Sequence, residues 1–546
     1  PPQGALPAGR TRGDPRGGPR TVRARMAGKP TRRADAGPGR NRWAVLPVVA
    51  LGVAMIIVDS TIVNVALPDV VRDLGLGLSG AEWVNSAYAL VFASLLVAVG
   101  AVADRAGRRR VFLAGVAVFA AASLLAGLAA SGGMLIGARL LQGLGGAMIL
   151  PTTLSIVNAT FRGRERAVAF GVWGSVIGGS AALGPLLGGW LTTNVSWRAI
   201  FLVNLPFALG IAVAALAVVP ESRDPRATGL RDPVGVALVS AGLAALVFGL
   251  IEGQRDGWWR ARGDVTLGPW DWPLPGSPVP WALAASGVLL TAFVLWLLHR
   301  RTRGRPALVD LGLFRLPSFR WGGVTILIVA LGEFGLVFVI PLYLQNVLGL
   351  SAFATGLVLL ALAGGAFASG GVAALSAGRL GGRRIVQAGM VLEAVGIVGF
   401  GLLVSADASP WRFVAPLFVY GWGVGFATAQ LTNVTLAEVP PAASGQASGV
   451  QSTLRQVGSA LGTAVLGVAL SLAVTAHTTS ALEARGARPP EAGRLARAVE
   501  SSAGTALPAL RAAPPTRAYA AALDGAFSDA VATVAYVAGG FVQLGL

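Results

Sequence analysis

Five charged side chains lie inside apolar segments that are long enough to cross a lipid bilayer: Asp59, Arg139, Glu333, Glu393 and Arg455. About 20 apolar residues in a helix span the ~30 Å hydrocarbon core. A charge at that depth is costly and is usually retained for a function, such as carrying a proton or pairing with a cation. Asp59 is our first candidate for a proton carrier. The alternative is a neutral, hydrogen-bonded structural aspartate.

Asp59 and Arg139 are expected to lie at similar depth. Asp59 is about 12 Å from Leu67 along its helix, and Arg139 is about 9 Å from Gly133, both measured from the outer face. If the two charges face one cavity, their attraction offsets part of the desolvation cost. We therefore predict that they interact directly or through water. In the alternative, Arg139 extends toward the outer headgroups.

Glu333 and Glu393 are second candidates, as extra proton sites or as counter-ions for a cationic substrate. Glu333 lies about 13 residues into its helix, close to the position of Asp59 in the first one, as an internal repeat of two halves would place it. For Glu393, a hydrogen-bonded structural acid is an equal alternative.

The composition indicates a polytopic membrane protein, since 54% of the 546 residues are hydrophobic and only 13% are charged. Cysteine is absent and histidine occurs twice, so metal sites, redox centres and Cys or Ser-His nucleophiles have almost nothing to be built from. The single lysine, Lys29, lacks the neighbours that a phosphate-binding loop needs. We expect no cofactor, no metal and no ATP hydrolysis.

The net charge of +19 is explained by basic residues in a leading tail and in short loops, not by nucleic-acid binding. Arginine follows the even-numbered apolar segments, which places both termini in the cytoplasm. We predict an all-α protein of fourteen helices, at residues 44–67, 81–103, 110–129, 133–158, 167–190, 199–219, 233–251, 280–298, 320–345, 354–375, 384–404, 411–435, 448–474 and 524–546.

The helices fall into two parallel sets of six with a two-helix insert that carries no ionisable residue in its apolar core. The insert is expected to face lipid. The predicted regions are a disordered basic cytoplasmic tail at 1–42, a six-helix bundle at 43–219, two inserted helices at 233–298, and a second six-helix bundle at 320–546 with a long, partly helical external loop at 476–523.

Four motifs carry a family resemblance that covers nearly the whole chain, and three of them precede the fifth helix. The segments DSTIVNVALP at 59–68 and GAVADRAGRR at 100–109 resemble signatures of the fourteen-helix drug:proton antiporters of the major facilitator superfamily. RLLQGLGG at 139–146 is similar to the fourth-helix motif, whose arginine is associated with proton coupling in that family. The resemblance implies the major facilitator fold.

The loop after the second helix is expected to act as a gate, and its motif residues are Gly100, Asp104, Arg105, Gly107 and Arg108. Gly107 permits a turn closed to other residues. Asp104 and Arg105 can make charge-assisted bonds to neighbouring helix ends, which break and re-form as the halves move. The alternative is an ordinary basic loop.

The matching loop of the second half departs from this pattern. With Gly107 aligned on Gly382, Arg379 stands where the acid should be. A symmetric pair of latches is therefore not expected.

The fifth helix resembles the antiporter signature of the family. Its small residues permit close backbone contact, and its proline removes a hydrogen bond and favours a bend. These residues are Gly174, Gly178, Gly184, Pro185, Gly188 and Gly189. A further match at 197–206 supports the resemblance but suggests no role.

The resemblance implies a bacterial inner-membrane antiporter that exports small amphipathic, cationic or zwitterionic compounds in exchange for protons, acting as a monomer within the lipid bilayer. An exporter dedicated to one endogenous secondary metabolite is an alternative. A non-transporting receptor or scaffold would have no use for the intramembrane charges. A membrane enzyme would need convergent catalytic groups, and none are found in the sequence.

Overall fold

The computed structural model describes residues 42–546, except for 77, 224–230, 256, 262–265, 268–269 and 273–275. The predicted tail at 1–42 lies outside the described residues apart from Arg42. Within the described part, 14 helices are long and apolar enough to cross a membrane, which is the predicted number.

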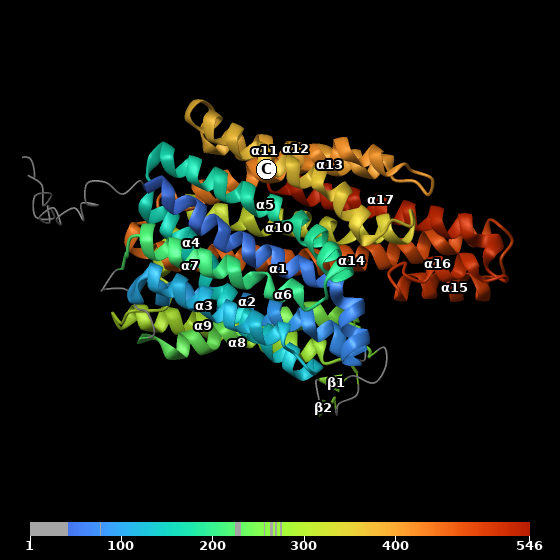
Figure 1. Ribbon diagram of the computed structural model, residues 1–546, viewed down its shortest axis with the longest axis horizontal. Helices are drawn as coiled ribbons and strands as arrows, with labels where there is room; N and C mark the ends of the chain where they lie inside the picture. The colour runs from blue at the N-terminus through green and yellow to red at the C-terminus, as the bar shows by residue number, and fades with distance from the viewer. Residues whose placement is uncertain are drawn as a thin grey trace, which may run out of the picture. The chain divides into compact units, whose positions relative to one another are not determined.

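The first half consists of long helices that pack side by side (Figure 1). α4 packs against α2 and α3, while α1 packs against α5 and also meets α4. The helices that carry Asp59 and Arg139 are therefore neighbours. The elements are η1 Arg42–Ala44, α1 Val45–Leu74, α2 Leu78–Ala106, α3 Arg108–Gly127, α4 Gly132–Thr160, α5 Gly163–Asn194, α6 Ala199–Leu202 and α7 Asn204–Val218.

The second half repeats this plan, with α10 packed against α14 and α12 against α13. α5 packs against α11 and α13, and α2 packs against α14, so these helices join the two halves. The elements are η3 Leu311–Arg315, α10 Pro317–Asn346, α11 Ala352–Leu380, α12 Gly382–Leu403, η4 Pro410–Phe413, α13 Val414–Thr435, η5 Pro441–Ala443, α14 Ser444–Glu483, α15 Pro489–Ser501, α16 Leu507–Ala512, η6 Arg517–Tyr519 and α17 Ala520–Leu544.

The region predicted as a long loop at 476–523 is mostly helical. α14 has 40 residues and continues well past the predicted end at 474. At about 1.5 Å per residue it is roughly twice as long as the hydrocarbon core is thick. α15 buries Ala492, Ala496 and Val499, which share one face of the helix. Arg511 of α16 then ties this extension to the end of α10, because it donates hydrogen bonds to backbone carbonyls there.

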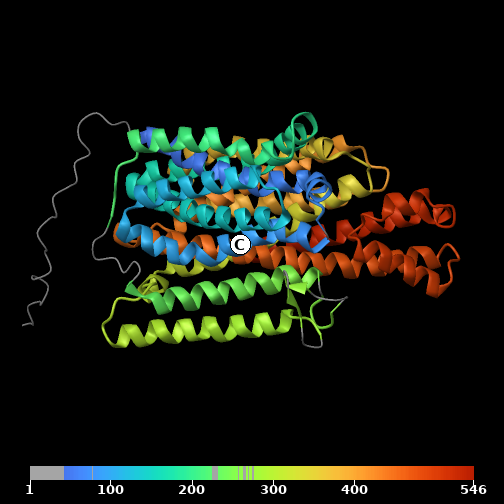
Figure 2. The same ribbon diagram turned by 60° about the horizontal axis from the view of Figure 1, so that its bottom comes forward.

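The inserted helices are α8 Pro233–Arg255 and α9 Val279–Thr302, with the antiparallel pair β1 Thr266–Leu267 and β2 Trp270–Asp271 between them. They lie together along one side of the helices (Figure 2). α9 packs on α8, and α8 packs on α2 and α14. Only 17% of the most apolar part of α9 is buried, compared with 39% for α8, which also covers the junction between α2 and α14. The low burial of α9 leaves most of its apolar side chains exposed.

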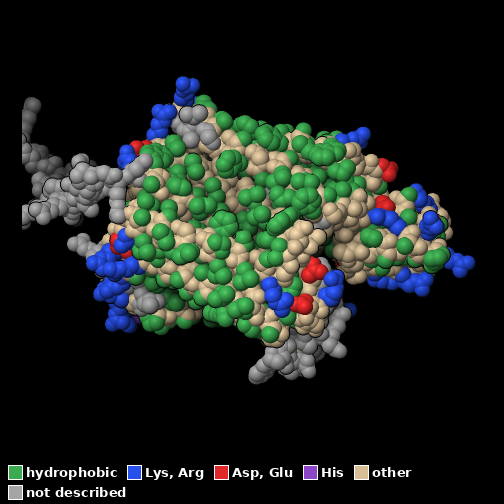
Figure 3. All heavy atoms as spheres, viewed as in Figure 1, with side chains coloured by type: hydrophobic (Ala, Val, Ile, Leu, Met, Phe, Trp, Pro, Cys, Tyr) green, Lys and Arg blue, Asp and Glu red, His purple; other side chains and the backbone are tan. Residues whose placement is uncertain are grey.

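On the face shown in Figure 3, hydrophobic side chains cover the long sides of the helices, while basic side chains gather at the ends. Each of the connections α2–α3, α4–α5, α9–η3 and α11–α12 has an arginine in an adjoining helix turn, namely Arg105, Arg164, Arg301 and Arg383 respectively. We call the end of the bundle formed by these connections the Arg-rich end. An excess of arginine in short loops is typical of one side of a membrane protein.

An ion pair lies at the opposite end, outside the membrane-spanning part of α1. Asp73 accepts hydrogen bonds from Arg198 Nη1 at 2.5 Å and from Trp197 Nε1 at 2.9 Å. These two hydrogen bonds lower the pKa of Asp73 below its usual value. The contact ties α1 to the connection between α5 and α6.

Candidate functional site

Asp59 of α1 and Arg139 of α4 form a salt bridge in which Arg139 Nη1 lies 2.5 Å from Asp59 Oδ2. Asp59 is 0% exposed and Arg139 is 1% exposed. The predicted contact is therefore present, and the alternative in which Arg139 extends to the headgroups is wrong. Because the pair is this deeply buried, removal of either partner alone would leave an unpaired buried charge and would strongly destabilise the protein.

Neutral polar side chains complete the surroundings of Asp59. Its Oδ1 accepts hydrogen bonds from Asn204 Nδ2 at 2.8 Å and from Gln142 Nε2 at 3.0 Å. Ser123 Oγ accepts from both amides, at 3.3 Å and 2.9 Å respectively. The site thus joins α1, α3, α4 and α7. We call Asp59, Arg139, Gln142, Asn204 and Ser123 the first-half cluster.

Arg139 makes further contacts that fix its orientation. Its Nε donates to the carbonyl oxygen of Val84 at 3.0 Å, and its Nη1 donates to Gln142 Oε1 at 2.9 Å. Its guanidinium carbon lies 4.5 Å from the centre of the Tyr88 ring, within the range of a cation–π interaction. These contacts would keep Arg139 in place if Asp59 lost its charge.

Sequence reasoning missed the amides of this cluster. Gln142 lies three residues after Arg139, so it shares that face of α4. Asn204 belongs to the 197–206 segment, to which we had assigned no role. A polar residue at a helical spacing from a buried charge was the available signal.

The second half contains a different ion pair, between Glu333 of α10 and Arg455 of α14. Arg455 Nη2 lies 3.2 Å from both carboxylate oxygens of Glu333. Arg455 Nη1 also donates to Thr428 Oγ1 at 3.3 Å, and Tyr420 donates its hydroxyl to the backbone carbonyl of Glu333 at 3.0 Å. Sequence reasoning noted Arg455 as an intramembrane charge but did not pair it.

Glu393 of α12 is 0% exposed. Neither of its carboxylate oxygens has a hydrogen-bond partner within the described part of the chain. Glu333 and Arg455 are close enough to act on it electrostatically. The described side chains therefore give no support to the alternative of a hydrogen-bonded structural acid. We call Glu333, Arg455 and Glu393 the second-half cluster.

Asp104, at the Arg-rich end of α2, bonds the first half to the second. Its carboxylate accepts from the backbone N–H groups of Gly445, at 2.8 Å, and Gln446, at 3.0 Å, in the first turn of α14. A helix N-terminus favours a negative charge at this position. Arg108 Nη2 lies 2.7 Å from Asp104 Oδ1 and donates to the carbonyl oxygen of Pro441 at 2.7 Å.

Glycines allow this contact. Gly107 has φ +115°, in the region that favours glycine, and α3 begins at the next residue. At Gly100, an added Cβ would collide with the backbone carbonyl of Gly445, so only glycine lets α2 and α14 come this close. Arg105 lies half-buried in the last turn of α2.

The second-half loop needs a correction in its alignment. Gly381, not Gly382, has the positive φ of +80° and precedes α12 as Gly107 precedes α3. Gly378 therefore takes the place of Asp104, and Arg379 takes that of Arg105. The absence of an acid at this position holds in either alignment.

The small residues of α5 serve two different faces. Gly184 and Gly188 lie against Thr61 and Ile62 of α1 in the same half.

The other face of α5 meets the second half. An added Cβ at Gly174 would lie 3.0 Å from Ala429, and one at Gly178 would collide with Ala366. Gly189 faces Phe353, at 3.7 Å. The helix continues through Pro185 from residue 163 to residue 194. The glycines therefore let α5 lie between the two halves.

Comparison with known proteins identifies the family. The family model described as Major Facilitator Superfamily matches residues 49–463. The chain belongs to the Major Facilitator Superfamily. This confirms the family predicted from the motifs.

Three relatives of this major facilitator protein carry names that refer to export, efflux or transport. It is 35% identical to the tetracenomycin C resistance and export protein of Streptomyces glaucescens, over 79% of this chain and 76% of that one. It is 33% identical to the multidrug efflux pump LfrA of Mycolicibacterium smegmatis, over 91% of this chain and 93% of that one. The probable actinorhodin transporter of Streptomyces coelicolor is 35% identical, over 79% and 72% of the two chains.

A solved structure shows the same fold. The human organic anion transporter MFSD10 (TETRAN) aligns with a TM-score of 0.56 and 15% identity, covering 92% of this chain and 100% of that one. At this identity the likeness concerns the fold alone.

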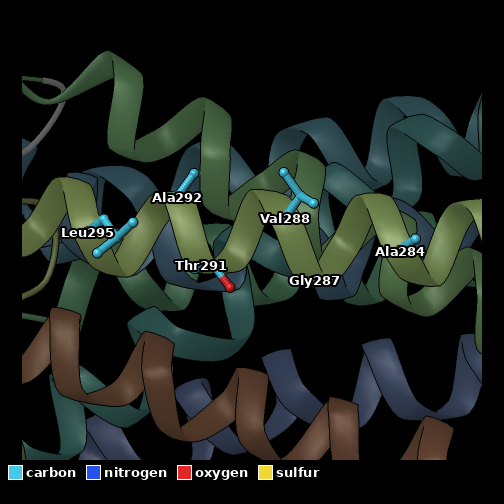
Figure 4. Close-up of a pocket in the computed structure, with 6 residues that line it drawn as sticks. All are labelled: Ala284, Gly287, Val288, Thr291, Ala292 and Leu295. Atoms are coloured by element: carbon cyan, nitrogen blue, oxygen red, sulfur yellow. The ribbon is translucent and has the colours of Figure 1, made fainter.

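A shallow groove on the exposed side of α9 is separate from both clusters in this major facilitator protein (Figure 4). The residues that line it are apolar, apart from the hydroxyl group of one threonine. The lining residues are Ala284, Gly287, Val288, Thr291, Ala292 and Leu295. Because it is an exposed apolar surface without a charged side chain, we assign it no part in transport.

Proposed function

We propose that this protein exports amphipathic drugs or antibiotics across the bacterial cytoplasmic membrane in exchange for protons, by alternating access. The efflux roles in the names of its relatives support this proposal. In this proposal the Arg-rich end and both termini face the cytoplasm, because short basic loops are retained on that side. The substrate is a small cationic or zwitterionic molecule, and the protein works as a monomer without a bound cofactor.

The observation that carries the proposal is the fully buried pair of Asp59 and Arg139. A proton that binds Asp59 removes one charge from a buried cluster, where electrostatic interactions are much stronger than in water. The salt bridge then weakens, while Val84 and Gln142 still bond Arg139. Such a local change in charge can bias a movement between two states.

The other candidate residues take supporting roles in the proposal. Gly100, Asp104, Arg105, Gly107 and Arg108 form a latch that must open when the Arg-rich end opens. Glu333 and Glu393 act as counter-ions for a cationic substrate or as extra proton sites. Two acids beside one arginine favour a cation, because they leave a negative charge unbalanced when both are ionised.

The test is export of a fluorescent lipophilic cation, such as ethidium, from cells that express the protein, with and without a proton uncoupler. We expect faster loss of the dye than in cells with an empty vector, and no difference once the uncoupler is added. Dye export that survives the uncoupler would contradict proton coupling.

A second candidate, a dedicated exporter of one secondary metabolite, is favoured by the two relatives named for tetracenomycin C and actinorhodin. A panel of chemically unrelated toxic compounds separates the two. Protection against several classes supports multidrug export, whereas protection against one class supports the dedicated exporter.

A further inference from the structure

A network of hydrogen bonds at the Arg-rich end joins the halves at a second place, away from Asp104. Arg166 lies in the first turn of α5 and is half-buried. Its Nε donates to Asn433 Oδ1 at 3.1 Å, and its Nη1 donates to the carbonyl oxygen of Leu436 at 3.4 Å. Both acceptors belong to the second half, at the end of α13. Arg166 therefore spans the boundary between the halves.

Asn158 at the end of α4 extends this network. Its Oδ1 accepts from Arg166 Nη1 at 3.1 Å, and its Nδ2 donates to Ser444 Oγ at 2.6 Å. Asn158 is 5% exposed and Ser444, at the start of α14, is 0% exposed. The ends of α4, α5, α13 and α14 thus meet at these side chains.

This network lies where the second half lacks an acid equivalent to Asp104. Asp104 at the end of α2 binds the N-terminus of α14, the fifth helix of the opposite half. The equivalent acid at the end of α11 would bind the N-terminus of α5, but Gly378 occupies its position. Arg166 lies at that N-terminus and points its bonds toward the second half.

We propose that Arg166 forms a second latch, bonded to neutral acceptors, which takes the place of the absent carboxylate latch and holds the Arg-rich end closed. The proposal rests on the proposed alternating-access transport and names a residue that controls it. Amide and carbonyl acceptors gain less from a guanidinium than a carboxylate does. Water can replace these bonds when the end opens, so the latch is reversible.

The chain contains no cysteine, which makes a direct test possible. Ser448→Cys places one thiol at a fully buried position one turn beyond Ser444 on α14. The rate at which a maleimide modifies this thiol in inside-out vesicles reports how often the Arg-rich end opens. The measurement needs neither a substrate nor a proton gradient, so its failure is distinguishable from a failure of the proposed function.

Arg166→Ala is expected to raise the modification rate at least about fivefold, because one hydrogen bond contributes roughly that factor and Arg166 makes two across the boundary. Asn433→Ala, which removes one of the two acceptors in the second half, should act in the same direction. The matched control is Arg164→Ala, an exposed arginine two residues earlier, which should leave the rate unchanged.

A combination with Asp104→Asn tests whether the latches are separate. The two effects on the rate should multiply if each latch holds the end independently. An unchanged rate in both Arg166→Ala and Asn433→Ala, or an equal increase in Arg164→Ala, would overturn the proposal. If Arg166→Ala does not fold, Asn433→Ala alone decides between these results.

Discussion

The two halves of the molecule each bury an acid beside an arginine, but they build the pair differently. In the first half, Asp59 on the first helix pairs with Arg139 on the fourth. In the second half, Glu333 on the first helix pairs with Arg455 on the fifth. Asp59 also accepts hydrogen bonds from neutral amides, whereas Glu393 beside the second pair has none in the described part of the chain.

This difference separates two kinds of site. The first-half cluster balances one acid with one arginine, so a single proton changes its net charge and its hydrogen bonds together. The second-half cluster holds two acids and one arginine. When both acids are ionised, its net charge is therefore neutralised only if a further cation binds. We therefore infer that the first-half cluster carries the transported proton and that the second-half cluster adjusts to the substrate's charge.

Asp59→Asn is expected to have the largest effect and to abolish export driven by a proton gradient. Asparagine has nearly the same size and can still accept a hydrogen bond from Gln142, so substrate binding should stay measurable. Vesicles with an imposed gradient measure export, and fluorescence titration measures binding. Normal export at normal expression would make Glu333 the next candidate for the carrier.

The next largest effect is expected for Glu333→Gln, which should reduce export about tenfold and lower the thermal stability. Its cause is an unpaired Arg455, since breaking a buried pair costs about 3–5 kcal/mol. Adding Arg455→Gln should then restore most of the stability and part of the export.

The equivalent double change in the first half, Asp59→Asn with Arg139→Gln, should restore stability without restoring export. This contrast separates a structural pair from a proton carrier. Recovery of export in both double variants would mean that the halves do not differ in the way we infer.

Asp104→Asn is expected to slow transport several-fold while the protein remains folded and inserted, because one charge-assisted contact with α14 is lost without a change in shape. Asp69→Asn, at an exposed acid near the opposite end of α1, is the control and should leave transport unchanged. Unaltered transport in Asp104→Asn would leave this loop with a role in orientation only.

Glu393→Gln is expected to have the smallest effect, less than about twofold on the export rate of a zwitterionic substrate, because no hydrogen bond to a described residue is lost and only the charge beside Arg455 changes. The measurement is the same vesicle assay, with a series of substrates of different charge. A loss as large as that of Glu333→Gln would show that the two acids act as one site.

Much of the fold could be predicted from the sequence, because apolar segments of bilayer length and arginine-rich loops are strong local signals. The pairing of Asp59 with Arg139 was also accessible, since both residues could be placed at one depth by counting from the helix ends. The family motifs gave a second reason to consider the two residues together, because Asp59 begins one motif and Arg139 begins another.

Other features depend on which helix faces meet, and counting along the chain does not give this. Asn204 and Ser123 are ordinary polar residues until the packing of α7 and α3 brings them to Asp59. The neighbouring pair of Gly381 and Gly382 leaves the alignment of the second loop ambiguous by one residue. The extension of α14 was not predicted, because the segment at 476–523 is rich in alanine, arginine and proline and was therefore interpreted as a loop.

The most direct test of the central claim is proton release on substrate binding. Purified protein in weakly buffered solution, with a pH-sensitive dye, should release protons when the exported cation is added. We expect this release from the wild type and from Glu393→Gln, and none from Asp59→Asn at substrate concentrations that saturate its binding. Release from Asp59→Asn equal to that of the wild type would contradict the assignment of the proton to the first-half cluster.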